Sequence, residues 1–363
     1  MARTRIAQDD QLRVTVGVDT HKDTHVARAK DQLGRRLGEV KIISTTPAGY
    51  RDLLGWAKSL GEIDTFGLEG TGSYGAGLAR CLRSEGAVVV EVIRPGRQTR
   101  WRNGKSDPAD ADAAATTVLS GDAAGSPKSG DAAVEMIRVL RVARSTAMRA
   151  RTQAANAMKA LVVTAPGDLR EQLRGLSTVK LVRVCVRSRP GELTNPTAAT
   201  KAALRSLAGR YESVEAEIKT LSAQLDLLIN EIAPQLVAIF GMGPDSAGAL
   251  LVAAGDNPDR LKSEAAFSML CGSSPIEASS GQVIRHRLNR GGDRQANAAL
   301  YRIVMVRLRW DSTTREYMAR RTREGKSKRE IVRCLKRYVA REVYTVLGAT
   351  SALGSMGPVD AVA

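Results

Sequence analysis

The order of strand-like and helix-like segments in the first third of the chain is the feature that most constrains its fold. Three short segments with alternating or β-branched residues, separated by polar turns, predict three strands in a meander. After them, amphipathic segments typical of helices alternate with apolar segments typical of buried strands. The expected elements are strands at 13–19, 25–30 and 38–44, a helix at 47–60, a strand at 63–70, a helix at 73–86, a strand at 87–93 and a helix from Asp107.

This order predicts a ribonuclease H-like mixed α/β sheet, and about 120 residues is an ordinary size for such a domain. The segment GDAAGSPKSG at 121–130 has the composition of a linker. Two long segments with helical periodicity and a basic face follow it. The expected regions are a nuclease-like domain at 1–125, a basic coiled coil or helical hairpin at 131–232, a mostly α-helical C-terminal domain at 233–350 and a disordered tail at 351–363.

Charge points to a polyanionic partner. The formal net charge is +17, from 55 Lys and Arg against 38 Asp and Glu, and nucleic acid is the leading partner for such a chain. Fourteen Lys or Arg against four acidic residues between Arg302 and Arg341 predict a nucleic-acid-facing surface there. The 241–256 segment, GMG followed by an apolar helix, resembles a helix-hairpin-helix element, which presents backbone N–H groups to a phosphate.

Other features exclude several classes of protein. Aromatic residues make up only 4% of the chain, which argues against a large base-stacking platform. No run of about 18 apolar residues occurs, so no membrane span is expected. The four cysteines are scattered without a CxxC pair, which supports neither a zinc knuckle nor a disulfide framework and fits a reducing cytoplasm.

Four acidic residues stand out by their positions. Asp19 follows the first strand, Glu69 ends the fourth, and Asp107 and Asp110 open the helix after the fifth. In a ribonuclease H-like sheet these places converge at one end of the central strands. Clusters of carboxylate oxygens are what Mg²⁺ requires, with Mn²⁺ as the alternative ion. Two such ions activate an attacking oxygen and stabilise a leaving one during phosphoryl transfer.

A simpler interpretation of DPAD, residues 107–110, is a helix start with Asp at the N-cap, Pro at the first helical position and an acidic residue at the third. The two aspartates of DPAD are three residues apart and share a helix face, whereas Asp112 points nearly opposite and is excluded from the site. His21 and His25 flank Asp19 and are interpreted as surface residues or as supports of the metal ligands.

Several motifs together resemble the transposases of the insertion-sequence one-ten family, the DEDD recombinases. The motifs are VGVDTHKDTHVA at 16–27, LEGTGSYG at 68–75, KSDPADA at 105–111, GMGPDSAGALLVAAGD at 241–256 and CGSSPIEASSGQVIRHRLNRGGDRQANAAL at 271–300. Their order and spacing match the family over nearly the whole chain. The resemblance implies a RuvC-like domain with its metal-binding catalytic carboxylates at Asp19, Glu69, Asp107 and Asp110, a coiled coil, and a C-terminal transposase domain with a nucleophilic serine.

Matching the family's Ser-Gly places that serine at Ser280, with Ser279 as the fallback. A serine hydroxyl that attacks a DNA phosphodiester leaves a covalent phosphoserine, which preserves the bond energy for rejoining. Without the resemblance, EASSGQ would be interpreted as a flexible turn. The residues expected to contact nucleic acid are Lys105, Ser279, Arg285, Arg287, Arg290 and Arg294.

The resemblance also implies partners: double-stranded DNA of the element ends and of the target, and a structured noncoding RNA that guides their choice. The long helices predict a homodimer, and the resemblance implies a tetramer on DNA, in the bacterial cytoplasm and associated with the nucleoid. Two other functions stay open at this point. One is a metal-dependent, Holliday-junction-type nuclease that uses water, and the other is a nucleic-acid-binding scaffold without catalysis.

Overall fold

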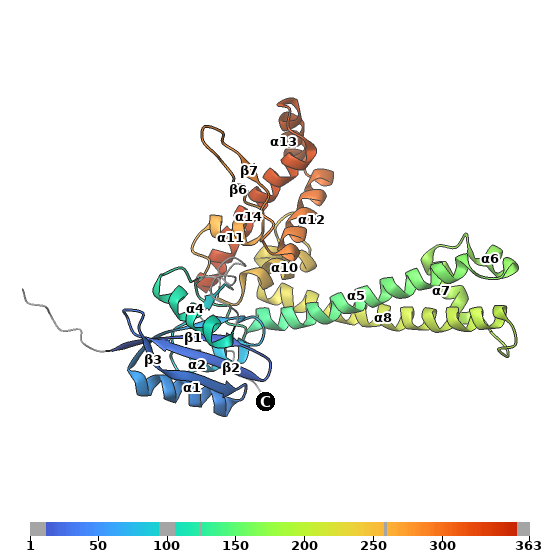
Figure 1. The fold of residues 1–363 in the computed structure, drawn as a ribbon. Coiled ribbons are helices and arrows are strands. Elements are labelled where there is room, and N and C mark those ends of the chain that lie inside the picture. The colour runs from blue at the N-terminus through green and yellow to red at the C-terminus, as the bar shows by residue number, and fades with distance from the viewer. Residues whose placement is uncertain (1–11, 94–105, 124, 258–259, 354–363) are drawn as a thin grey trace, which may run out of the picture. The chain divides into compact units, whose positions relative to one another are not determined.

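The computed structural model describes residues 12–93, 106–123, 125–257 and 260–353 (Figure 1). It divides into two compact units. The first contains residues 1–132 together with 254–262, and the second contains 133–253 and 263–363. The predicted linker at 121–130 belongs to the first unit, and the two regions predicted at 131–232 and 233–350 share the second.

A five-stranded mixed sheet forms the centre of the first unit. Its strands are β1 (Arg13–Thr20), β2 (Thr24–Lys30), β3 (Arg36–Ser44), β4 (Glu62–Glu69) and β5 (Val89–Val92), in the order β3-β2-β1-β4-β5. The first three pair antiparallel, and β4 and β5 run parallel to β1. The mixed α/β sheet expected for this part of the chain is therefore confirmed.

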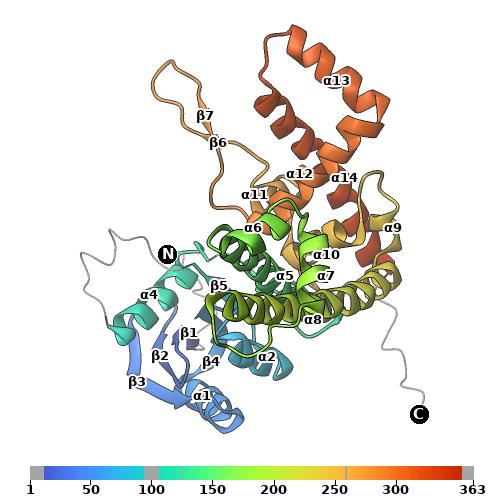
Figure 2. The same ribbon diagram turned by 90° about the vertical axis from the view of Figure 1, so that its right-hand side faces the viewer.

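Helices lie on both faces of this sheet (Figure 2). They are α1 (Pro47–Leu60), α2 (Ala76–Ser84) and α4 (Asp107–Leu119). Because successive strand residues point to opposite faces, Val14, Val16 and Val18 of β1 face α1 and α2, where they join the buried core around Leu53 and Leu78. The alternate residues of β1 face α4. A central strand covered on both faces is buried along nearly its whole length, as β1 is.

Local sequence explains where α1 begins. Thr46 is the N-cap, and its side-chain oxygen accepts a hydrogen bond from the Gly49 N–H. Pro47 follows at the first helical position, where its missing N–H costs nothing. The helix then ends at Gly61, as predicted from the pattern at 47–60.

A short segment from late in the chain, residues 254–262, packs with the first unit. The Asn257 side chain donates a hydrogen bond to the Pro127 carbonyl at 2.8 Å and accepts one from the Ser129 N–H at 3.1 Å. The guanidinium of Arg83 donates to the Ser129 carbonyl at 2.6 Å. The two bonds of Asn257 hold the 254–262 segment against residues 127–129, and the bond from Arg83 attaches residues 127–129 to α2.

Two long antiparallel helices, α5 (Ala133–Val163) and α8 (Pro196–Ile232), extend through the second unit (Figure 1). Their direction follows from two cross-contacts, Arg151 with Glu215 at 2.6 Å and Arg144 with Ser222 at 2.7 Å. At their far end, α6 (Gly167–Leu173) and α7 (Thr178–Arg187) cover a local apolar core.

The rest of the second unit is mostly helical. Its elements are α9 (Pro234–Val237), α10 (Pro244–Ala254), α11 (Glu264–Leu270), β6 (Ile276–Glu277), β7 (His286–Arg287), α12 (Arg294–Trp310), α13 (Ser312–Arg323) and α14 (Lys328–Leu353). Asp293 and Asp311 cap α12 and α13 through their carboxylates. Helix α14 reaches three residues into the predicted tail, and 354–363 lie outside the described residues. No helix in the described part of the chain is long and apolar enough to cross a membrane.

Candidate metal centre and nucleic-acid surface

Two paired glycines let α4 lie directly on the sheet. Gly17 of β1 and Gly67 of β4 are neighbours in the parallel register. A Cβ atom at Gly17 would lie 2.1 Å from the Ala111 carbonyl oxygen, and one at Gly67 would lie 2.4 Å from Cγ2 of Val118. At Gly17 the helix backbone itself leaves no room for a side chain, so only glycine fits there, whereas at Gly67 the nearest neighbour is the Val118 side chain. The helix that begins with the two DPAD aspartates is thereby pressed against the centre of the sheet.

The strand period places two acidic residues on that same face. Asp19 and Glu69 each follow one of these glycines by two positions, so their side chains point to the face that α4 covers. Val18 pairs with Leu68, so Asp19 and Glu69 come next at the ends of adjacent parallel strands. Both side chains are buried. The register thus explains why Asp19 and Glu69, which are far apart in the sequence, lie at the same end of two adjacent strands.

Helix α4 begins at Asp107, as the sequence predicted, but Asp107 is its first residue and not its N-cap. Ser106 is its N-cap, with extended backbone angles, and the Ser106 carbonyl accepts hydrogen bonds from the N–H groups of Ala109 and Asp110. The interpretation of Asp107 as the N-cap was therefore wrong, because the proline after it fits the second helical position as well as the first. The Asp107 carboxylate is not used for capping and is turned toward β1.

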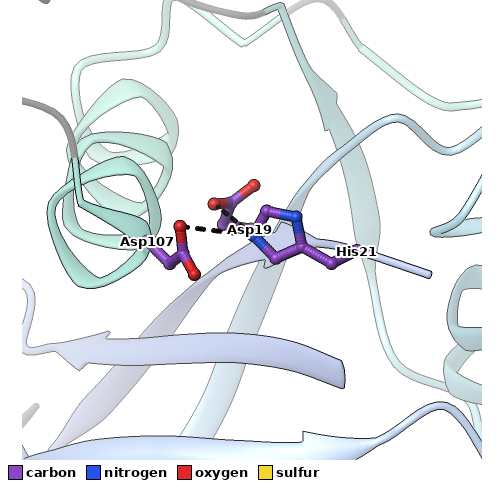
Figure 3. A group of neighbouring side chains, drawn as sticks. All are labelled: Asp19, His21 and Asp107. Carbon is purple, nitrogen blue, oxygen red and sulfur yellow. Dashed lines mark ion pairs between the residues drawn. The ribbon is translucent and has the colours of Figure 1, made fainter. Parts of the chain in front are cut away.

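His21 lies between two of the predicted carboxylates (Figure 3). Its Nε2 is 3.1 Å from Oδ2 of Asp19 and 3.4 Å from Oδ1 of Asp107. One ligand atom from each of the three residues lies within 4.8 Å of the others. Sequence reasoning treated His21 as a surface residue or a support, and so missed its direct place in the cluster. The available signal was its position two residues after Asp19, in the tight turn between β1 and β2.

His25 is not a surface residue. It is completely buried on β2, and its ring stacks on Tyr50 with 5.9 Å between ring centroids. Burial lowers the pKa of His25, and the neighbouring charge of His21 lowers this pKa further. The ring is therefore neutral near pH 7, and its Nδ1 accepts a hydrogen bond from the His21 N–H at 3.3 Å. The surface interpretation was wrong for this residue, which supports the turn that carries His21.

Glu69 and Asp110 complete the predicted set at nearby places. Glu69 ends the strand beside that of Asp19, and its backbone carbonyl accepts a hydrogen bond from Thr20 Oγ1 at 2.9 Å. Asp110 is buried on α4, three residues after Asp107. Among the described residues, the tight three-residue group contains neither of these two. His21 thus contacts both Asp19 and Asp107. Glu69 lies at the end of the neighbouring strand, and Asp110 lies on the first turn of α4.

Asp112 faces away from this cluster, as the helical spacing predicts. Its carboxylate accepts hydrogen bonds from Lys30 Nζ at 3.0 Å and Arg36 Nε at 2.8 Å. Partial burial raises the pKa of Asp112, but the hydrogen bonds from Arg36 and Lys30 outweigh this and leave the pKa below its usual value. Asp112 is therefore an ionised partner for a buried lysine.

The donor set fits a hard divalent cation. Carboxylate oxygens from two strand ends and one helix start are the ligands that Mg²⁺ and Mn²⁺ accept. Asp19 and Glu69 are buried whereas the Asp107 side chain is 56% exposed. The group therefore combines two buried carboxylates, which the strands hold in place, with one exposed carboxylate on α4.

The candidate serines lie on a hairpin in the second unit. Ser280 and Val283 exchange two backbone hydrogen bonds of 3.1 Å around Gly281, whose φ of +59° favours glycine. The Ser279 hydroxyl is engaged with the backbone of Arg285, accepting from its N–H at 3.2 Å. For the exposed Ser280 hydroxyl, no hydrogen bond is seen among the described residues.

A basic cavity of about 1620 Å³ lies in the second unit, between the 272–294 segment and helices α12 to α14. Arg287, Arg290 and Arg294 line it as expected of nucleic-acid contacts, but Arg285 and the two serines do not. Lys105 lies outside the described residues. Eight basic residues of the predicted 302–341 surface also line the cavity, and they are Arg321, Lys326, Lys328, Arg329, Arg333, Lys336, Arg337 and Arg341.

Two basic residues of that surface have structural partners instead. Arg302 pairs with Asp245 at 2.9 Å, and Arg307 pairs with Glu342 at 2.8 Å. Within the cavity, Lys336 donates to Oδ1 of Asn297 at 2.8 Å, and its burial lowers its pKa. Charge counting along the sequence picked out a segment whose basic residues line this cavity, but it could not separate the groups that face the cavity from those that hold helices together.

Comparisons with known proteins give a consistent result. Residues 16–165 match a family of DEDD transposases of IS110 type, and residues 233–319 match the "Transposase IS116/IS110/IS902 family". The two matches cover about two thirds of the chain. Over 125 residues, the chain is 30% identical to the "Insertion element IS110 uncharacterized 43.6 kDa protein" of Streptomyces coelicolor. That match covers 34% of this chain and 31% of the relative, so it spans about a third of the relative's length.

Proposed function

Because this chain belongs to the IS110 family of transposases, we propose that it cuts and rejoins the DNA of insertion-element ends and target sites. The observation that carries this proposal is that Asp19 and Glu69 end two adjacent inner strands of the sheet, and that a carboxylate oxygen of Asp107 on α4 lies within 4.8 Å of one of Asp19. The strand order β3-β2-β1-β4-β5 with acidic residues at the ends of β1 and β4 also supports a ribonuclease H-like, RuvC-like domain.

In this proposal Asp19, Glu69, Asp107 and Asp110 hold Mg²⁺, or Mn²⁺ in its place. A divalent ion bound there screens the charge of a DNA phosphate and favours the deprotonated form of an attacking hydroxyl. The protein's part is positioning. The glycine-mediated contact of α4 with β1 and β4 sets the spacing of the carboxylates, and burial of Asp19 and Glu69 keeps them from reorienting.

Ser280 is the proposed nucleophile. Its Oγ attacks a backbone phosphorus, an Oγ–P bond forms as a P–O bond of the DNA strand breaks, and the serine proton goes to the leaving oxygen. A hydroxyl of a second DNA strand then displaces the serine, so the number of phosphodiester bonds is conserved and no nucleotide cofactor is consumed. Ser280 is favoured over Ser279 because the Ser279 hydroxyl is already hydrogen-bonded to the hairpin backbone.

The basic cavity of the second unit is proposed to bind phosphates of DNA or of a structured guide RNA. Arg287, Arg290 and Arg294 supply charge from one side and α14 from the other. The antiparallel pair α5 and α8 leaves several apolar side chains exposed, among them Met136, Val139 and Val142, which supports a coiled-coil dimer that forms a tetramer on DNA. The proposed place of action is the nucleoid in the bacterial cytoplasm.

A cleavage assay on DNA carrying the element's own ends tests the carboxylate centre. Asp19→Asn and Glu69→Gln are expected to lower Mg²⁺-dependent cleavage by at least about a hundredfold, since each removes a charged ligand. Asp64→Asn is the matched control, because Asp64 is exposed on the same strand as Glu69 but near its opposite end. Normal cleavage by Asp19→Asn would exclude the proposed site, and binding without any cleavage by the native chain would favour a scaffold.

The guide RNA is tested separately. Nucleic acid that co-purifies with the native chain is digested with ribonuclease or deoxyribonuclease and sequenced. A discrete RNA encoded next to the gene supports the proposal, and the absence of any specific RNA from active protein contradicts it.

A further inference from the structure

We infer that His21 is itself a ligand of the divalent ion, so that the centre has one nitrogen donor among its carboxylate oxygens. The inference rests on the proposed function, because it takes the metal centre as given and adds a residue to it. None of the expected catalytic residues supplies nitrogen.

Distances around the imidazole carry the inference. Neighbouring ligands of an octahedral ion, each about 2.1 Å from the metal, lie about 3.0 Å apart. Nε2 of His21 lies 3.1 Å from Oδ2 of Asp19 and 3.4 Å from Oδ1 of Asp107 (Figure 3). The nitrogen is therefore nearly at the separation of an adjacent ligand from each carboxylate oxygen, and one ligand atom from each of the three residues lies within 4.8 Å of the others. An imidazole that only filled space near the carboxylates would not need to aim one nitrogen at both.

The backbone holds His21 in place although its ring is 39% exposed. Its N–H donates to the Thr24 carbonyl at 3.2 Å and to Nδ1 of His25 at 3.3 Å. His25 is completely buried and stacked on Tyr50. The β1–β2 turn is thus fixed by a buried, stacked histidine that accepts the His21 N–H, and the ring that the turn presents to Asp19 and Asp107 is held in that orientation. Such supporting contacts are typical of metal-binding histidines.

Nitrogen in the set changes which ion is favoured. Imidazole suits Zn²⁺, Cu²⁺, Fe²⁺ and Ni²⁺ best, whereas Mg²⁺ and Mn²⁺ are bound mainly through oxygen. Loss of His21 should consequently weaken the binding of Zn²⁺ more than that of Mn²⁺, and the binding of Mg²⁺ least.

Pulsed electron paramagnetic resonance of Mn²⁺ bound to the full-length protein tests this directly, because it detects a coordinated ¹⁴N nucleus. The chain has three histidines, which makes the source of a signal assignable. Native protein is expected to show imidazole coupling, which disappears in His21→Ala and persists in His286→Ala, the exposed control in the other unit. Mn²⁺ affinity should fall by at least about tenfold in His21→Ala.

The outcomes separate this inference from the proposed function. Mn²⁺ binding that Asp19→Asn abolishes, but without nitrogen coupling in native protein, overturns the role of His21 and leaves the carboxylate centre standing. Coupling that survives in His21→Ala also overturns it. Mn²⁺ binding that is unchanged in Asp19→Asn overturns the metal centre and this inference with it.

Discussion

Asp107 and Asp112 lie five residues apart on one helix, but only Asp112 is expected to contribute strongly to the stability of the fold. Asp112 neutralises Lys30, whose side chain is only 9% exposed and which also donates to Thr116 Oγ1 at 2.7 Å. Asp107 is more than half exposed and faces His21 at the candidate centre. Removing the partner of a buried charge, as at Asp112, lowers the free energy of unfolding strongly. Removing an exposed carboxylate, as at Asp107, changes it little.

We therefore predict that Asp112→Ala lowers the free energy of unfolding of the first unit by about 3–5 kcal/mol, because it leaves the Lys30 ammonium buried without its counter-charge. Asp107→Asn should change that free energy by less than about 0.5 kcal/mol while it weakens Mn²⁺ binding. Hydrogen exchange of β1 and α4 amides measures the stability, and titration with Mn²⁺ measures the site. Equal destabilisation by both substitutions would contradict the division of roles.

Helix α4 and the two central parallel strands act as one element because glycine allows their backbones to touch. The pattern Gly-x-acid occurs twice, at Gly17 to Asp19 and at Gly67 to Glu69, and in each case the glycine fixes the helix and the acidic residue faces it. A side chain at either glycine has to push α4 away from the sheet. In the proposed metal centre, ligand spacing is therefore expected to depend on the packing at this contact.

Gly17→Ala is predicted to destabilise the first unit by about 1–3 kcal/mol or more, as an overpacked contact does, and to reduce Mn²⁺ affinity although it alters no ligand. Gly55→Ala is the control. Gly55 is exposed within α1 with open space around it, so alanine should stabilise that helix by up to about 1 kcal/mol. Thermal unfolding with and without Mn²⁺ reports both effects. Unchanged Mn²⁺ affinity in Gly17→Ala would show that α4 does not set the ligand spacing.

Periodicity and strand order were enough to predict the sheet and its helices, because these follow from local patterns. Parallel pairing of β1 and β4 also places Asp19 and Glu69 at the same end of adjacent strands. Helix 47–60 matches α1 at both ends. His21 was missed because its role depends on how one four-residue turn folds back over buried His25, which no pattern encodes. The simpler interpretation of DPAD assigned the N-cap of α4 to Asp107 and not to Ser106, because both are good N-caps by residue type.

At the scale of the whole molecule, the candidate chemistry is divided between two units. The carboxylates belong to the first, and Ser280 and the basic cavity belong to the second. The net charge is +17, and arginine and lysine cluster around the cavity. Both features support the proposal that contacts to phosphate groups dominate the binding of nucleic acid.

We predict that the affinity for DNA or RNA falls steeply with salt, and that Arg290→Ala and Arg294→Ala each reduce the slope of log K against log [salt] by about 1. Lys58→Ala, exposed on α1 in the first unit, should leave the slope unchanged. Fluorescence anisotropy at several salt concentrations measures this. Slopes that Arg290→Ala and Arg294→Ala do not alter would place the nucleic acid outside the cavity.

The central claim is that a carboxylate centre and Ser280 together break and rejoin DNA strands. The most direct measurement is recovery of a covalent protein–DNA adduct after denaturation, with mass spectrometry of the modified peptide. We predict a Mg²⁺-dependent adduct on Ser280 in native protein, retained in Ser279→Ala and lost in both Ser280→Ala and Asp19→Asn. DNA cleavage at the normal rate by Ser280→Ala, with no adduct in native protein, would contradict the account and identify a nuclease that uses water.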